Sequence, residues 1–202
     1  RYQEALHAAD SIMTFKYVVR TVAEKRNLYA TFMPKPLYGQ AGNGMHLNMS
    51  LQKKGENAFV DTKDKMGLSK EAYSFMAGLM KHIEGITILT NPLVNSYKRL
   101  VPDFEAPVYI AWSGQNRSPL IRVPSGRGAS TRIELRSPDP SANPYLALAL
   151  CLEAGLDGIR NNTKPPKPID KNIFEMSKRE LTRSGVKKLP ANLFEAINKV
   201  EK

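Results

Sequence analysis

The stretch that decides the fold reads Thr131-Arg-Ile-Glu-Leu-Arg-Ser137, an alternation of polar and apolar residues. Because successive side chains of a β-strand point to opposite faces, Ile133 and Leu135 should share the buried face of a strand. Arg132, Glu134 and Arg136 should then project together from the other face. Cations flanking a carboxylate suit a site for a metal ion and anionic oxygens, although a bland exposed strand also carries charges of mixed sign.

A second stretch has the same design and reads Met45-His-Leu-Asn-Met-Ser-Leu51. Its odd-numbered residues are apolar, so His46, Asn48 and Ser50 should line up on the opposite face. A lone histidine is usually structural. An imidazole and a carboxylate, with phosphate oxygens completing the shell, nevertheless suit Mg²⁺ or Mn²⁺ better than zinc. His46 and Glu134 supply only two protein ligands, so further carboxylates would have to come from elsewhere. We expect the two strands to form the walls of one cleft.

Composition places the chain among globular proteins. It has 202 residues, of which 42% are hydrophobic and 24% charged, and this length suffices for one large domain or two small ones. The formal net charge of +11 implies anionic partners, such as nucleic acid, a membrane surface, acidic proteins or phosphorylated small molecules. The single cysteine, Cys151, lies in an apolar run, so we expect a buried, inert thiol and a reducing, cytoplasmic location.

Targeting and membrane signals are not visible in the sequence. No apolar stretch reaches the length of a membrane span, and no signal peptide precedes the first periodic segment. The chain opens at Arg1, already close to a helical pattern, and ends without a helix stop signal. We interpret it as a piece of a longer protein.

Periodicity and punctuation predict an α+β fold, with a curved, mainly antiparallel sheet, helices packed on one side and the polar cleft on the other. Ser69 and the Asn143-Pro144 pair are good helix N-caps, and Ser177 with Glu180 has the spacing of a capping box. The expected helices cover 4–26, 70–83, 144–157, a segment after Ser177 and a segment opened by Pro190. The expected strands cover 29–33, 45–51, 108–112, 120–123 and 131–137. Residues 91–107 are expected to be irregular.

Arginine is concentrated in the middle of the chain. Six arginines fall between Arg99 and Arg136, whereas no lysine occurs between Lys98 and Lys164. A solvated basic face would not need this exclusion, and arginine is preferred over lysine for bidentate recognition of carboxylate and phosphate. Glu105, between prolines in the same region, is a candidate mobile carboxylate. The pattern therefore favours recognition of anionic groups.

These residues resemble the catalytic domain of bacterial type I glutamine synthetase. The stretches that match come in the family's order and cover nearly the whole chain. They are Ala30-Thr-Phe-Met-Pro-Lys-Pro36, Gly42-Asn-Gly-Met-His46, Asn91-Pro-Leu-Val-Asn-Ser-Tyr-Lys-Arg-Leu-Val-Pro102, Asn116-Arg-Ser118, Arg132-Ile-Glu-Leu-Arg136 and Asn143-Pro-Tyr-Leu146.

The resemblance implies ATP-dependent condensation of L-glutamate with ammonia through γ-glutamyl phosphate, with Mg²⁺ or Mn²⁺ as cofactor. It places His46 and Glu134 at a metal ion, and Glu105 on a flap that closes over the intermediate. The remaining roles follow position by position: Arg99, Arg136 and the backbone around Gly42 for glutamate, Arg117, Arg122 and Arg132 for phosphate groups, and Asn48 and Ser50 for the nucleotide.

The resemblance also implies a larger assembly. Residues 1–202 would be part of the catalytic domain, without the N-terminal β-grasp domain and the remaining carboxylate ligands. Family active sites form between subunits of a dodecamer of two hexameric rings, so the isolated piece is expected to be inactive. The chain departs from the family at Ala41, where asparagine is usual, which leaves a substrate contact to be lost or taken over by Asn43. Phe174 lies in the segment where one bacterial subfamily carries an adenylylated tyrosine, so that control is not expected.

Three other interpretations stay open. One is a related ligase that joins glutamate to a larger amine. A second is a nucleic-acid-binding module, which the net charge suggests, although no recognised nucleic-acid motif is present and the arginines are not interleaved with stacking aromatics. The third is an autonomous interaction module, although exposed cut surfaces argue against it and predict self-association or aggregation.

Overall fold

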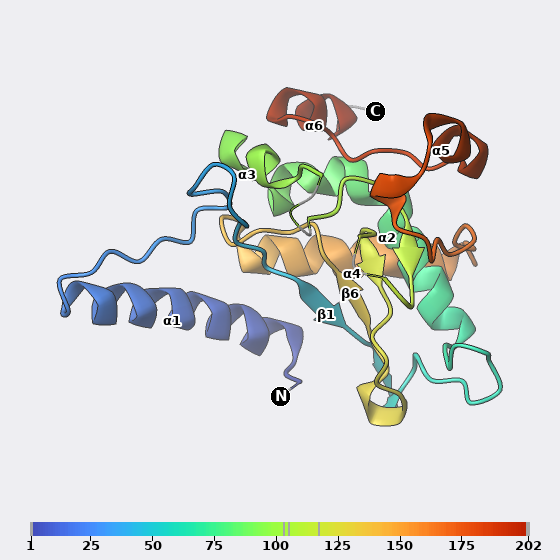
Figure 1. Ribbon diagram of the computed structural model, residues 1–202. Coiled ribbons are helices and arrows are strands. Elements are labelled where there is room, and N and C mark those ends of the chain that lie inside the picture. The colour runs from blue at the N-terminus through green and yellow to red at the C-terminus, as the bar shows by residue number, and fades with distance from the viewer. Residues whose placement is uncertain (1, 103, 105, 117, 201–202) are drawn as a thin grey trace.

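The computed structural model describes residues 2–102, 104, 106–116 and 118–200. Its central sheet contains β1 (Leu47–Met49), β4 (Trp112–Ser113), β5 (Ile121–Arg122) and β6 (Ile133–Leu135), in the order β1-β6-β5-β4 (Figure 1). The β1–β6 and β6–β5 pairs are antiparallel, and β5–β4 is parallel. A separate hairpin joins β2 (Gln52–Lys53) to β3 (Glu56–Asn57). The α+β class with a mainly antiparallel sheet is therefore confirmed.

Helices account for most of the regular structure. They are α1 (Ala5–Glu24), α2 (Lys70–Thr90), α3 (Val94–Arg99), α4 (Pro144–Arg160), α5 (Lys178–Ser184) and α6 (Leu193–Val200), with short 3₁₀ turns at Gly128–Ser130 and Ile173–Glu175. The expected N-caps are confirmed: the Ser69 hydroxyl accepts from the Ala72 N–H at 3.1 Å, and the side-chain Oδ1 of Asn143 accepts from the Tyr145 N–H at 3.0 Å. Ser177 and Glu180 form the expected capping box.

The hydrophobic core lies between the sheet and the α2–α4 pair, which Figure 1 shows crossing behind the strands. Ile121, Ile133 and Leu135 contribute its sheet side, and each is fully buried. The two helices approach so closely that a β-carbon at Gly158 would collide with the backbone of Ser74 and lie 2.7 Å from the Gly78 nitrogen. Glycine at the crossing is therefore a packing requirement.

Three local expectations are wrong. Residues 29–33 have no regular secondary structure and pair with no described strand. The stretch 91–107 was expected to be irregular, yet it contains α3. The last helix begins at Leu193 rather than at Pro190, because the Asn192 side chain accepts from the Glu195 N–H at 2.8 Å and caps it there.

Cys151 lies on the buried face of α4, and burial raises the pKa of its thiol from the ordinary 9.0 to about 12. The thiolate is the reactive form, so at pH 8 its fraction should fall about a thousandfold below that of a free cysteine. We expect no reaction with a disulfide reagent over hours in native buffer, and one thiol per chain in denaturant. Rapid native labelling would show that the α4 face opens.

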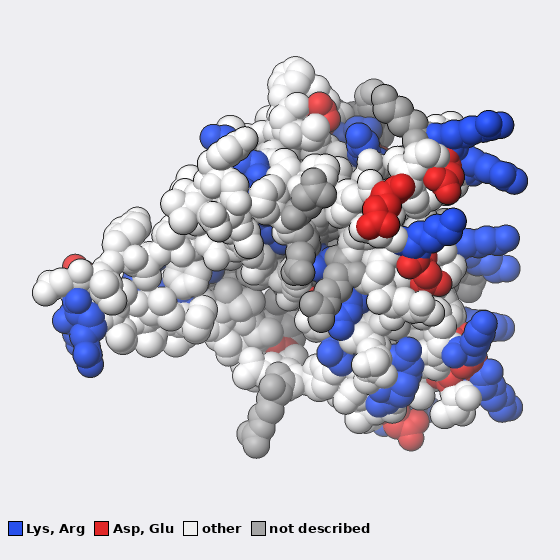
Figure 2. All heavy atoms as spheres, viewed as in Figure 1, with Lys and Arg blue, Asp and Glu red and all other residues white. Residues whose placement is uncertain are grey.

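Among the described residues, no helix combines the length and apolar character needed to cross a bilayer. Lys and Arg side chains crowd one edge of the face drawn in Figure 2, with Asp and Glu between them. The net positive charge on this face is thus interrupted by acids rather than arranged as one continuous cationic stripe.

Candidate active site

The register of the sheet places Glu134 in the middle of a polar cross-strand row. Glu134 pairs with Asn48 on β1 and with Arg122 on β5. The neighbouring row, which faces the core, consists of Leu47, Leu135 and Ile121. The apolar side chains of β6 therefore face the core and Glu134 faces the polar side, as the alternation in 131–137 predicts. His46, one residue before β1, reaches the same polar face.

Glu134 is held by cations on both carboxylate oxygens. Its Oε1 lies 2.9 Å from His46 Nδ1 and 4.0 Å from Arg136 Nε, and its Oε2 accepts from Arg122 Nη1 at 3.1 Å. The hydrogen bond from His46 is the largest cause that lowers the pKa of Glu134; burial opposes it, and the charges of His46, Arg122 and Arg136 reinforce it. The carboxylate is therefore ionised at neutral pH.

The polar face is more enclosed than an open strand face would be. Glu134 is 7% exposed and Arg136, just after β6, only 3%, and all three residues of β6 are buried. Burial of a charge is costly unless it is paired, and here Glu134 has pairing partners on three sides. This enclosure by distant segments is the feature that alternation alone does not reveal.

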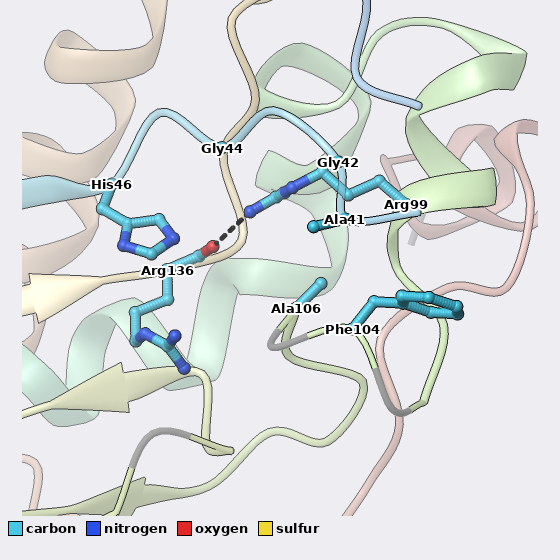
Figure 3. A pocket seen from close by; sticks show the side chains of 8 residues that line it. All are labelled: Ala41, Gly42, Gly44, His46, Arg99, Phe104, Ala106 and Arg136. Atoms are coloured by element: carbon cyan, nitrogen blue, oxygen red, sulfur yellow. Dashed lines mark hydrogen bonds between the residues drawn. The ribbon is translucent and has the colours of Figure 1, made fainter. Parts of the chain in front are cut away.

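A cavity of about 540 Å³ opens beside His46, the hydrogen-bond partner of Glu134 (Figure 3). The loop before β1, the end of α3 and the end of β6 supply its walls, and Arg99, Arg136 and His46 present their polar groups to it. Its lining among the described residues is Ala41, Gly42, Gly44, His46, Arg99, Phe104, Ala106 and Arg136.

The glycines of the loop allow this close approach. A β-carbon at Gly44 would lie 2.6 Å from Arg99 Nη2 and 3.1 Å from His46 Nε2, and one at Gly42 would collide with the Pro34 carbonyl. Only a residue without a side chain lets the loop backbone pass this near to the guanidinium. Gly42 and the backbone around it were candidates from the sequence, and Ala41 was singled out there at the position of a substrate contact; Phe104 and Ala106 were not predicted.

Arg99 is 4% exposed and is fixed by main-chain oxygens. Its Nη1 donates to the Ser137 carbonyl at 2.7 Å, and its Nη2 donates to the Arg136 carbonyl at 3.1 Å (Figure 3). Burial lowers the pKa of Arg99 to about 10, which leaves the guanidinium charged at neutral pH. Two buried cations, Arg99 and Arg136, thus line one cavity, which suits a ligand with carboxylate or phosphate groups.

The other described candidates are not among the residues that line the cavity. Arg132 Nε donates to Asn48 Oδ1 at 2.9 Å, and Arg132 Nη1 to the Ser130 carbonyl at 3.1 Å. Ser50, just beyond β1, is half-buried and is not part of the cavity lining among the described residues. Glu105 and Arg117 lie outside the described residues.

The donor set fits part of a divalent-cation site. An octahedral Mg²⁺ or Mn²⁺ with bonds of roughly 2.1 Å places neighbouring ligands about 3.0 Å apart, and His46 Nδ1 and Glu134 Oε1 are 2.9 Å apart. Among the described residues, however, no group of three His, Cys, Asp or Glu side chains comes together. The pair can contribute two ligands, as the sequence predicts, and the rest must come from phosphate, water or other carboxylates.

Taken from geometry alone, the molecule is an α+β protein with an arginine-lined cavity for an anionic ligand, beside an imidazole–carboxylate pair that can hold a cation. The family description "Glutamine synthetase, catalytic domain" matches residues 1–202. The chain belongs to this family.

Similar proteins agree with this assignment. The glutamine synthetase of Clostridium saccharobutylicum is 61% identical over 198 residues, covering 98% of this chain and 45% of the relative. That of Staphylococcus aureus (strain MW2) is 60% identical over 197 residues, covering 98% and 44%. The chain therefore spans less than half the length of these relatives.

Solved structures share the fold. A structure described as a "GmaS/ADP complex" superposes with a TM-score of 0.89 at 39% identity, covering 100% of this chain and 46% of that one. A structure described as "Apo GmaS without ligand" gives 0.87 at 40% identity, covering 100% and 45%. The arrangement of helices and strands is thus shared with proteins twice as long.

Proposed function

We propose that the full-length parent of this chain ligates ammonia to L-glutamate at the expense of ATP, through γ-glutamyl phosphate. The observation that carries the proposal is the junction of two features: the His46–Glu134 pair lies at the edge of the cavity that Arg99 and Arg136 line. One side can hold a cation and phosphate oxygens, and the other can hold carboxylates. Membership of the glutamine synthetase family favours ATP as the phosphate-bearing ligand and glutamate as the carboxylate-bearing one.

In this proposal Arg99, Arg136 and the backbone around Gly42 bind the carboxylates of glutamate. A γ-carboxylate oxygen attacks the terminal phosphorus of ATP, the bond to the bridging oxygen breaks, and ADP leaves. Phosphoryl transfer needs little covalent chemistry from a protein but much positioning and neutralisation of charge. The two buried guanidinium groups supply both without reorganisation at the moment of reaction.

The nucleotide would lie over the outer part of the sheet. Arg122 and Arg132 face its phosphates, and Asn48, which orients Arg132, and Ser50 approach the nucleoside. His46 and Glu134 hold a divalent ion, which, when bound, supplies positive charge to the transferring phosphoryl group. The ADP in the GmaS structure supports a nucleotide in this fold.

Two further roles rest on the family resemblance. Arg117 would stabilise the transferring phosphoryl group. Glu105 would close over the acyl phosphate, exclude water and accept a proton from ammonium, after which ammonia attacks the acyl carbon and inorganic phosphate leaves. An open site would lose the intermediate to hydrolysis, so a closing carboxylate suits the chemistry.

The proposal includes the setting of the reaction. Residues 1–202 form part of a catalytic domain in a cytoplasmic enzyme, which assembles as a dodecamer of two hexameric rings. Nucleic acid and membrane are not its partners: the acids interspersed among surface cations in Figure 2 support this, because a nucleic-acid site favours an uninterrupted cationic track.

The 202-residue chain alone should form no glutamine, because its described residues offer only two ligands where a divalent ion needs more. The full-length parent should form glutamine from glutamate, ammonia, ATP and Mg²⁺, with one ADP released per glutamine. Both are measured by chromatographic product analysis. Glutamine formation by the purified short chain would contradict the first expectation.

The same assay distinguishes the acceptor. Ammonia, ethanolamine and polyamines are supplied in parallel to the parent, and the products are identified by mass. The 60–61% identity to proteins named glutamine synthetase favours ammonia. A product formed only with a larger amine would assign the chain to a related ligase instead.

A further inference from the structure

The position of Arg99 depends on two backbone carbonyls. Both of its terminal nitrogens donate to oxygens of the segment that follows β6, at Arg136 and Ser137. The same segment carries the Arg136 side chain into the cavity (Figure 3). Whatever fixes the Ser137 carbonyl therefore sets the geometry of both cavity arginines together.

Asn91, the C-cap residue of α2, is the second donor to that carbonyl. It is completely buried, and its Nδ2 donates to the Ser137 carbonyl at 2.8 Å. The same Nδ2 donates to Asp139 Oδ2 at 2.9 Å, and its Oδ1 accepts from the Thr90 hydroxyl at 2.9 Å. Every polar atom of the Asn91 side chain is thus engaged, so the amide has one orientation.

Asp139 holds Asn91 from behind. Its carboxylate is completely buried and accepts from the Ser141 N–H at 2.9 Å and from the Ser141 hydroxyl, and its own N–H donates to the Thr90 carbonyl at 3.2 Å. The hydrogen bonds to its carboxylate come from the Asn91 amide and from the N–H and hydroxyl of Ser141, which are neutral groups. Burial is the largest influence on the pKa of Arg99 and lowers it, and the nearby Asp139 carboxylate raises it in the opposite direction.

We propose that Asn91 and Asp139 are positioning residues for the cavity: they fix the Ser137 carbonyl and, through it, the guanidinium groups of Arg99 and Arg136. Neither touches the cavity itself. The identity of the ligand as the acid substrate rests on the proposed function, whereas the dependence of Arg99 on Asn91 does not.

Asp139→Asn in the full-length parent separates position from charge. Removing a negative charge behind an anion site would, by electrostatics alone, strengthen binding and lower KM for glutamate. Loss of position weakens binding, and we expect KM for glutamate to rise about tenfold while KM for ATP stays within about twofold. An unchanged or lowered KM for glutamate overturns the proposal.

Asn91→Leu removes the donors without changing the charge or much of the volume, and Asn91→Ser serves if that variant does not fold. Both should raise KM for glutamate about tenfold with little effect on KM for ATP. Thr87→Val is the control, because Thr87 is equally buried on α2 but its hydroxyl donates only within the helix, to Ile83. A rise in the control as large as in the Asn91 variants would assign the effect to general destabilisation and overturn the proposal.

A structural measurement keeps the inference separate from the proposed function. If the wild-type parent makes no glutamine, the proposed function fails, and a crystal structure of the Asn91→Ser parent decides the rest. We expect the Arg99 guanidinium to leave hydrogen-bond distance of at least one of its two carbonyls. An Arg99 that keeps both bonds in the variant overturns the positioning role.

Discussion

Glu134→Ala in the full-length parent is expected to reduce turnover by about three orders of magnitude or more. The substitution removes the one carboxylate that the cross-strand row places among His46, Arg122 and Arg136. Without it the proposed cation loses a ligand. His46, Arg122 and Arg136 then lie close together with no negative charge between them. Steady-state release of phosphate and formation of glutamine measure the loss.

Two companion variants define what the loss means. Glu134→Gln keeps the shape and part of the hydrogen bonding but not the charge, so it should be nearly as inactive while folding more securely. Glu153→Gln removes the same charge at an exposed position of α4, where the carboxylate pairs with Arg160, and should leave turnover unchanged. Near-normal turnover in both Glu134 variants would refute the role of Glu134 at the metal.

Among substitutions that add a single methyl group outside the site, Gly158→Ala is expected to reduce the stability of the fold most. The added carbon would collide with the Ser74 carbonyl and lie 2.7 Å and 2.8 Å from the nitrogen and Cα of Gly78, which are backbone atoms that cannot rotate away. The two helices must separate, and we expect a loss of about 3 kcal/mol in the free energy of unfolding. The midpoint temperature should fall by roughly 6 to 12 °C.

Gly85→Ala is the matched control on α2. A β-carbon there meets only the Lys199 carbonyl at 3.6 Å, an ordinary contact. Because alanine favours the helix over glycine, this variant should be neutral or up to about 1 kcal/mol more stable. Urea and thermal unfolding of the three chains provide the comparison; equal stability of the Gly158 and Gly85 variants would mean that α2 and α4 cross farther apart than described.

Local patterns predicted the elements whose signal is local. The alternation around Glu134 gave the correct face for Ile133 and Leu135, and the caps at Ser69 and Asn143 lie where their side chains can satisfy free N–H groups. The thiol of Cys151 is buried as expected. Each of these depends on neighbours within a few residues.

The wrong expectations arise either from a partner strand that is absent among the described residues or from local contacts that set where a short helix begins. Residues 29–33 have strand-like composition, but no described strand lies beside them to complete a ladder. Conversely, α3 is only six residues long, too short to show a helical period, and begins where the Ser96 hydroxyl accepts from the Leu93 N–H at 3.2 Å.

The site was predictable in its chemistry but not in its enclosure. The sequence grouped His46 with Glu134, 88 residues apart, by matching two alternating strands, and the structure brings them into contact. It offered no signal for Asn91 or Asp139, since a buried amide and carboxylate in a loop resemble surface turn residues. Their importance appears only when the Ser137 carbonyl is seen to accept from both Asn91 and Arg99.

A crystal structure of the full-length protein soaked with Mn²⁺ and a non-hydrolysable ATP analogue tests the central claim most directly. We predict one metal ion bound by both His46 and Glu134, with analogue phosphate oxygens on the same ion and within hydrogen-bond distance of Arg122 or Arg132. Metal and phosphates bound elsewhere, with the His46–Glu134 hydrogen bond intact, would contradict it.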